Sequence, residues 1–292
     1  MIFLDLLYVF KNQNTLFKII DFEGIGLHSG EKVKIILTPA AEDTGIKFKI
    51  NNSLIPATWK NAIVSQLCTR IKLKDDAIST IEHLMAAISG LGITNLLIKI
   101  NSNEVPILDG SSKEFVEKIK NIGIKEQKKP QKILKILKKV EYKEKDKFIR
   151  ILPSKKKNLT IDYTIDYKDQ LIKKQSLKYV HSENNFLKIY MSRTFCLHND
   201  LERIFSMGLA KGGSLDNAIV VSGKKILNQS GLRYSDEFVR HKILDCVGDL
   251  YLAGCQIWGN LITYQGGHEL NLRLLREILG NKKNYKIIDQ KT

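Results

Sequence analysis

The fold of the second half of the chain is predicted from residues 235–254, SDEFVRHKILDCVGDLYLAG. This stretch predicts a helix, and HELNLRLLREILG, residues 268–280, predicts another near the end of the chain. Strands are expected upstream, at ILKILKKVEY (133–142), at FIRILP (148–153) as its hairpin partner, and at the alternating segment 158–167. The second half therefore has the pattern of an α+β unit.

Both halves of the chain have the same order of predicted elements: strands, a helix, a strand and a helix. Strands are expected at residues 33–38, 45–50 and 95–100, and helices at 81–92 and 111–122. The expected helix signals are Ser79 or Thr80 as a cap, Gly90 or Gly92 as an end, and Ser111 with Glu114 as a capping box. The two halves thus suggest a weak internal duplication of one α+β unit.

A length of 292 residues favours two domains, and a polar segment with a proline separates the halves. KEQKKPQK, residues 125–132, is the candidate linker, which predicts an N-terminal domain at 1–128 and a C-terminal domain at 129–292. The apolar run at the N-terminus lacks the basic start and cleavage site of a signal peptide, so residues 1–12 are expected to be a short extension, with an edge strand as the alternative. No apolar run reaches the roughly 18–20 residues that a membrane-spanning helix needs.

The chain is basic, with a formal net charge of +16, and much of this charge lies in residues 125–157. Such a stretch can contact phosphate on nucleic acid or on an anionic membrane, but it is also typical of a lysine-rich solvated surface. We favour the solvated surface and expect no nucleic-acid binding, because the only aromatic residues there are Tyr142 and Phe148. The scattered cysteines form no CxxC pair, which fits a reducing cytoplasm.

Candidate metal ligands lie on both of the central predicted helices. His241 and Asp245 are four residues apart, so they project from one helix face and can hold one zinc ion. His83 can supply a third ligand, and the adjacent Glu82 is then placed to act as a general base. Asp249 lies one turn further and can orient a neighbour. A simple surface pair of histidine and aspartate is the alternative for the i, i+4 motif.

Three glycine-containing segments have further candidate roles. His268 follows two glycines in GGHELN, so it can approach a ligand closely and protonate a leaving amine, although a histidine in an ordinary loop is the alternative. Residues 24–30 lack the lysine of a phosphate-binding P-loop and predict a tight turn. Gly212 and Gly213 fit a bend as well as they fit a phosphate contact. The sequence contains no HExxH motif, so a zincin-type protease is not indicated.

Taken together, these motifs resemble the UDP-3-O-acyl-N-acetylglucosamine deacetylases, the zinc enzymes of lipid A synthesis. The resemblance runs from about residue 15 to about residue 280, in the family's order and spacing. The matching segments are FEGIGLHSG (22–30), STIEHLMAAISGLGITNLLIKI (79–100), EVPILDGSS (104–112), SRTF (192–195), GLAKGGSLDNAIVV (208–221), LRYSDEFVRHKILDCVGDLYLAG (232–254) and GHELN (267–271). The family fold implied is two similar α+β domains, each a β-sheet with helices, with the helices packed between the two sheets.

The resemblance also implies a role for each matching residue. The implied zinc ligands are His83, His241 and Asp245, and the implied catalytic residues are Glu82 as general base, His268 as general acid, Asp249 as the carboxylate that orients His268, and Thr194 as the hydroxyl that stabilises the oxyanion. The implied substrate contacts are Lys242, Phe195, Leu67, Leu201 and Gly213. An insert near residues 193–215 corresponds to a hydrophobic passage for the acyl chain, with apolar Leu197, Leu201, Ile204 and Leu209.

The cofactor implied is one Zn²⁺ per chain, with Fe²⁺ as an alternative because ligand type does not fix the metal. The partner implied is a UDP-linked acylated amino sugar, and we expect a cytoplasmic monomer with peripheral contact to the anionic inner membrane as a hypothesis. Gln265 and Glu269 depart from the family, which often has lysine and alanine there. Three alternatives remain: a different N-acetylated substrate, a basic nucleic-acid-binding protein, and a purely structural zinc site.

Overall fold

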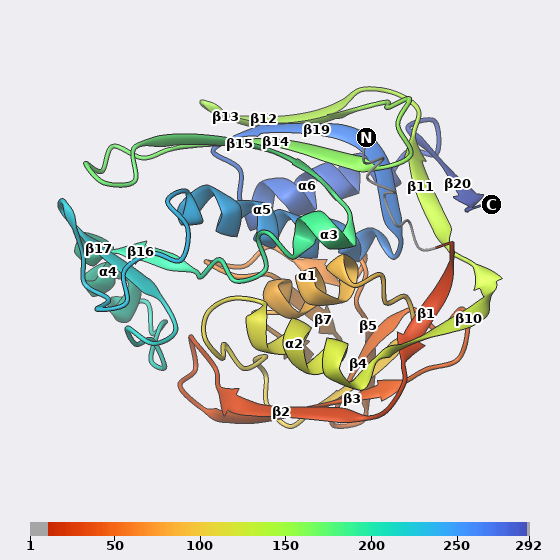
Figure 1. The fold of residues 1–292 in the computed structure, drawn as a ribbon, viewed down its shortest axis with the longest axis horizontal. Coiled ribbons are helices and arrows are strands. Elements are labelled where there is room, and N and C mark those ends of the chain that lie inside the picture. The colour runs from red at the N-terminus through yellow and green to blue at the C-terminus, as the bar shows by residue number, and fades with distance from the viewer. Residues whose placement is uncertain (1–10, 291–292) are drawn as a thin grey trace, which may run out of the picture.

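The computed structural model describes residues 11–290, which form two large β-sheets with helices packed between them (Figure 1). The first sheet has the strand order β2-β3-β9-β4-β5 and is built from the first half of the chain. Only β4 and β9 run parallel in it. Its strands are β2 (Ile20–Ile25), β3 (Lys32–Pro39), β4 (Ile46–Ile50), β5 (Ser53–Pro56) and β9 (Leu96–Ile100).

The second sheet has seven strands from the second half of the chain, with β19 at its centre. β19 pairs with β13, β11 and β14, and the edges of the sheet are β12, β15 and β20. Its strands are β11 (Lys132–Ile136), β12 (Val140–Glu144), β13 (Lys147–Leu152), β14 (Leu159–Asp166), β15 (Lys174–Val180), β19 (Gln256–Tyr264) and β20 (Tyr285–Asp289). The implied α+β fold, with helices packed between two sheets, is therefore confirmed.

The helices form the middle layer, and its centre is the contact between α1 and α5 (Figure 1). Gly248 makes this contact close, because a Cβ atom there would lie 2.1 Å from the backbone oxygen of Glu82. The helices are α1 (Glu82–Gly90), α2 (Lys113–Ile122), α3 (Glu183–Phe186), α5 (Glu237–Leu250), η2 (Tyr251–Ala253) and α6 (His268–Leu279). No helix among residues 11–290 is long and apolar enough to cross a membrane.

Two small three-stranded sheets complete the fold. One three-stranded sheet has the order β6-β7-β8 and precedes α1, and another has the order β16-β17-β18 and carries α4 (Figure 1). The strands of these two sheets are β6 (Ala62–Ile63), β7 (Arg70–Leu73), β8 (Asp76–Ile78), β16 (Phe195–Leu197), β17 (Ile219–Ser222) and β18 (Lys225–Ile226). The helical turns after β16 are η1 (His198–Asp200) and α4 (Leu201–Ser206).

The segment 125–132 is not the linker that its composition predicts. Residues 125–130 belong to β10 (Ile124–Pro130), which pairs antiparallel with β1 (Asn12–Leu16), and Lys132 begins β11. Gln127 supplies a reason, since its amide donates to the Ala40 carbonyl and its side-chain oxygen accepts from Asn95. The domain division at residues 128/129 stays a prediction. Of the expected extension, residues 1–10 lie outside the described residues.

Three further expectations are wrong in detail. The predicted strand 133–142 is divided into β11 and β12, which lie in one sheet with β13 and β19 between them. α1 begins after Ile81 without a side-chain cap, because the Thr80 hydroxyl donates to Glu104 instead. α2 begins after Ser112, also without a side-chain cap, so the expected capping box at Ser111 does not form.

Candidate active site

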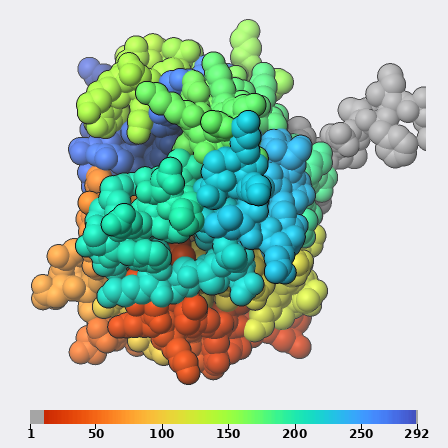
Figure 2. Space-filling model, turned by 90° about the vertical axis from the view of Figure 1, so that its left-hand side faces the viewer, coloured from red at the N-terminus to blue at the C-terminus, as the bar shows by residue number. Residues whose placement is uncertain are grey.

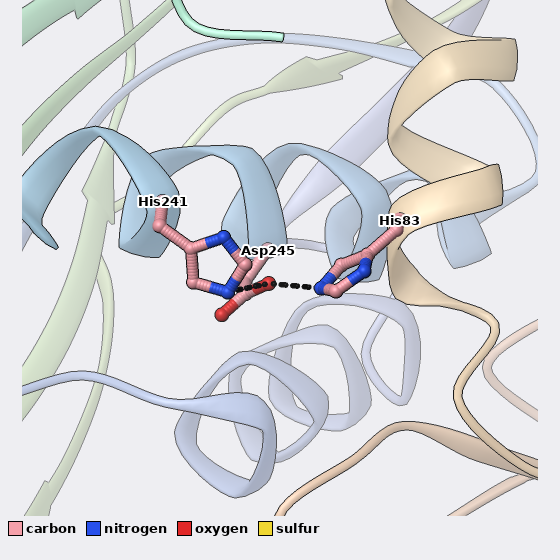
Figure 3. Close-up of side chains that lie close together, drawn as sticks. All are labelled: His83, His241 and Asp245. Carbon is pink, nitrogen blue, oxygen red and sulfur yellow. Dashed lines mark ion pairs between the residues drawn. The ribbon is translucent and has the colours of Figure 1, made fainter. Parts of the chain in front are cut away.

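Two helices from different halves of the chain bring three predicted metal ligands together. His83 lies in the first turn of α1, while His241 and Asp245 lie on the face of α5 that is turned toward α1 (Figure 3). Asp245 Oδ1 is 3.4 Å from His83 Nε2 and 3.3 Å from His241 Nε2. All three side chains are buried, so the site is built into the contact between the halves.

The donor set fits a divalent cation with nitrogen and oxygen ligands. One ligand atom from each of the three residues lies within 4.8 Å of the others. Asp245 Oδ1 is buried and has no hydrogen-bond partner among the described residues, as expected for an atom whose partner is a metal ion. His241 Nδ1 lies 3.0 Å from the Ser192 carbonyl, which fixes the proton there, and burial lowers the pKa of His241 to about 3. His241 is therefore neutral, with Nε2 available as a ligand.

Glu82 is the buried carboxylate beside this group. Glu82 is 3 % exposed, and its Oε2 accepts a hydrogen bond from the Thr69 backbone N–H at 3.0 Å. Its other oxygen, Oε1, lies 3.9 Å from His268 Nε2. Burial raises the pKa of Glu82 above its ordinary value. A carboxylate with a raised pKa is suited to accepting a proton.

His268 lies opposite, at the first position of α6. A Cβ atom on Gly266 would lie 2.5 Å from Thr263 Oγ1, so this glycine permits the close approach of the chain that carries His268. The imidazole Nδ1 is 2.9 Å from Asp249 Oδ2. Burial opposes a charge on the ring, but Asp249, with smaller contributions from Glu82 and Asp245, outweighs it and the pKa of His268 rises to about 9. His268 is thus protonated at neutral pH and can donate a proton from Nε2.

A cavity of about 1190 Å³ opens from this site. Its polar end contains the three metal-ligand candidates, Glu82 and His268. Its walls include every substrate contact implied by the resemblance: Lys242, Phe195, Leu67, Leu201 and Gly213. Thr194 lines the cavity too, while Asp249 stands behind His268. The site residues implied by the resemblance are therefore near one another, and their individual roles stay predictions.

The insert at residues 193–215 covers one side of the cavity, in the middle of the face shown in Figure 2. Its apolar residues on the cavity wall include Leu197, Leu201, Ile204, Phe205 and Met207. Leu209, which was expected on this wall, is not among the lining residues. Phe205 is 54 % exposed although it is large and apolar, so part of this wall faces solvent. The shape and chemistry fit an alkyl chain that enters from outside.

Lys242 lies on the cavity wall between a metal-ligand candidate and an aromatic ring. Lys242 Nζ lies 2.9 Å from Asp245 Oδ2 and 5.7 Å from the centre of the Phe195 ring. Gln265, where the family often has lysine, lines the cavity and donates to the Asp166 carbonyl.

The expected tight turn at residues 24–30 is present. Glu104 holds it by accepting hydrogen bonds from the backbone N–H groups of His28 and Ser29.

The structure adds residues that the sequence did not single out. Thr69 contacts Glu82, Asp249 and His268. Arg193 forms a buried ion pair with Glu237, one turn before His241 on α5. Thr69 lies in no matching segment. Other added residues, including Ser192, Arg193 and Asn271, lie in matching segments, but nothing in the sequence assigned them a role, so only their contacts identify it.

Comparisons with known proteins identify the family of the chain. The family model LpxC, described as UDP-3-O-acyl N-acetylglycosamine deacetylase, matches residues 13–280. Three similar proteins carry the name UDP-3-O-acyl-N-acetylglucosamine deacetylase. Those of Campylobacter fetus and Campylobacter jejuni are 41 % and 43 % identical, with 94 % of both chains covered. The Haemophilus ducreyi protein is 43 % identical, covering 94 % of this chain and 92 % of its own. The chain therefore belongs to the family of UDP-3-O-acyl N-acetylglycosamine deacetylases.

Proposed function

We propose that the chain hydrolyses the acetamide of UDP-3-O-acyl-N-acetylglucosamine and releases acetate and UDP-3-O-acyl-glucosamine. The observation that carries this proposal is one cavity that joins a three-ligand group, a buried carboxylate and a protonated histidine to an apolar wall. Amide hydrolysis needs a base for water and an acid for the departing amine, and Glu82 and His268 supply this pair. Family membership supports the substrate.

The metal proposed is Zn²⁺, one per chain, held by His83, His241 and Asp245. Two imidazoles and one carboxylate leave a position open, as catalytic zinc sites do, and Fe²⁺ is an alternative with the same ligands. When bound, the metal supplies Lewis-acid chemistry: it polarises the acetamide carbonyl and makes water more acidic.

The residues of the chain carry the proton transfers. Glu82 accepts a proton from the water that attacks the acetamide carbon, and the Thr194 hydroxyl donates a hydrogen bond to the oxyanion that develops. The C–N bond then breaks as His268 Nε2 donates its proton to the nitrogen, which leaves as the sugar amine. Asp249 keeps His268 charged and oriented through the contact at Nδ1.

The remaining cavity residues are proposed as substrate contacts. Lys242 and Gly213 contact the polar part of the sugar nucleotide, and Phe195, Leu67 and Leu201 contact the sugar and the acyl chain. We further propose a cytoplasmic monomer. The lysines of residues 125–157 are all exposed, which fits a solvated surface and leaves peripheral contact with the anionic inner membrane as a hypothesis.

Acetate release from the purified protein tests the function. We expect turnover of UDP-3-O-acyl-N-acetylglucosamine with about one bound metal per chain, loss of turnover with chelator, and recovery on adding Zn²⁺. Recovery with Fe²⁺ at a higher rate would assign the metal differently. Metal binding without acetate release would place the substrate elsewhere among N-acetylated compounds. A protein without metal that shifts DNA in a salt-sensitive way would contradict the proposal as a whole.

The apolar wall predicts that the acyl chain contributes to affinity. Burying each CH₂ stabilises a complex by about 0.8 kcal/mol, so about ten buried carbons can contribute several kcal/mol. We expect UDP-N-acetylglucosamine, which lacks the acyl chain, to have a kcat/KM lower by at least about 10³, since every 1.4 kcal/mol is tenfold. The measurement is acetate release at matched enzyme concentration. Equal kcat/KM for the two compounds would remove the passage assignment.

A further inference from the structure

We infer that Thr69 is a positioning residue that couples the proposed general base to the proposed general acid. This inference rests on the proposed function, and it assigns a role to a residue that no sequence motif marks. Thr69 immediately precedes β7 in the small sheet β6-β7-β8 and is 5 % exposed. It reaches both proton-transfer residues, one through its backbone and one through its side chain.

The backbone contact fixes the base. The Thr69 N–H donates to Glu82 Oε2 at 3.0 Å, and the Thr69 carbonyl accepts the Ile81 N–H at 3.4 Å. Ile81 is the residue at which α1 begins. Because one Glu82 oxygen is occupied in this way, the other oxygen, Oε1, is the one directed toward His268, at 3.9 Å from Nε2.

The side-chain contact fixes the acid. The Thr69 hydroxyl donates to Asp249 Oδ1 at 2.5 Å, and its oxygen lies 3.1 Å from His268 Nδ1. A hydroxyl has one hydrogen, so with that hydrogen on Asp249 its oxygen can only accept from the imidazole. The Nδ1–H of His268 is therefore shared between Asp249 Oδ2, at 2.9 Å, and Thr69. Both acceptors keep the proton at Nδ1 and direct Nε2 into the site.

The remaining contacts of Asp249 show why the hydroxyl is needed. Asn271 donates to Oδ2 at 2.8 Å, the same oxygen that lies nearest the imidazole. Oδ1 receives the Thr69 hydroxyl, and Asp249 is 2 % exposed, so water has little access to replace this hydrogen bond. Without the hydroxyl, the buried oxygen loses its donor and the carboxylate can rotate away from His268.

Thr69→Val tests the inference, because valine keeps the shape and the backbone N–H while it removes the hydroxyl. We expect kcat for acetate release to fall about 10- to 100-fold, as for other groups that orient a reacting residue, with KM within about twofold and metal content unchanged. Thr69→Ser restores the hydroxyl and is expected to keep kcat within about threefold. Thr69→Ala is a second hydroxyl-free variant that must show the same loss of kcat as valine.

A double-mutant cycle separates positioning from a structural effect. In an Asp249→Asn background, Thr69→Val is expected to cost less than about threefold, because the hydroxyl acts through the carboxylate that is already altered. Full multiplication of the two losses, or wild-type kcat in Thr69→Val, would overturn the inference. Either result is obtained with a wild-type enzyme that releases acetate, so it leaves the proposed function intact. A wild-type protein that releases no acetate would instead contradict the proposed function.

Discussion

Glu82→Gln is expected to lower kcat for acetate release by about 10² to 10⁴, the usual contribution of a positioned acid or base. Glutamine keeps the size of the side chain, and its amide oxygen can still accept from the Thr69 N–H, so the fold and the metal ligands should be unaffected. An amide cannot take a proton from water near neutral pH, so the loss appears in kcat and equally in kcat/KM. Steady-state kinetics on metal-replete protein provide the measurement.

The matched control is Glu117→Gln, the same substitution on the exposed face of α2. It should leave kcat and metal content unchanged, because Glu117 is outside the residues that line the cavity. Near-normal turnover of Glu82→Gln with one metal per chain would remove Glu82 as the base. A loss of metal in Glu82→Gln would instead show that the carboxylate supports the adjacent ligand His83.

Much of this site can be predicted because its main signals are local. His241 and Asp245 are one helical turn apart, so any helix over this segment places them on one face. Glu82 and His83 likewise begin a helix that the apolar run predicts. The contact between these two helices is not local, and Gly248 allows it in a way that sequence spacing alone does not show. The resemblance to a family supplied that step.

The errors have a common physical cause, which is competition from distant partners. Thr80 has the composition of a helix cap, but its φ of +56° and its hydrogen bond to Glu104 direct it to the turn at residues 24–30. The polar segment 125–132 has the composition of a linker, but its backbone groups pair with β1. Thr69 contacts Asp249 across 180 residues of sequence. No window of neighbouring residues contains these partners.

The largest expected effect on stability comes from the buried ion pair between Arg193 and Glu237. The Arg193 Nε is 2.9 Å from Glu237 Oε1, and the two side chains are only 4 % and 0 % exposed. Removing one partner of a buried pair leaves the other charge without compensation and costs about 3–5 kcal/mol. Arg193→Met is therefore expected to lower the free energy of unfolding by about that amount, measured by urea denaturation. Arg203→Met is the matched control, because the Arg203 side chain is 60 % exposed in its pair with Asp200.

We expect the control to cost less than about 1 kcal/mol, as exposed ion pairs do. Arg193 also lies between two residues of the site in the sequence. The carbonyl of Ser192 accepts a hydrogen bond from His241 Nδ1, and Thr194 lines the cavity. Glu237 holds Arg193 through both its backbone N–H and its guanidinium. Arg193→Met removes the guanidinium contact, so the neighbouring Ser192 and Thr194 are held less firmly and kcat should fall in addition to stability. Adding Glu237→Gln to Arg193→Met removes the uncompensated charge and should recover part of the lost stability. A double variant less stable than Arg193→Met would show that the Glu237 contacts to backbone N–H groups, and not its charge, dominate the stabilisation.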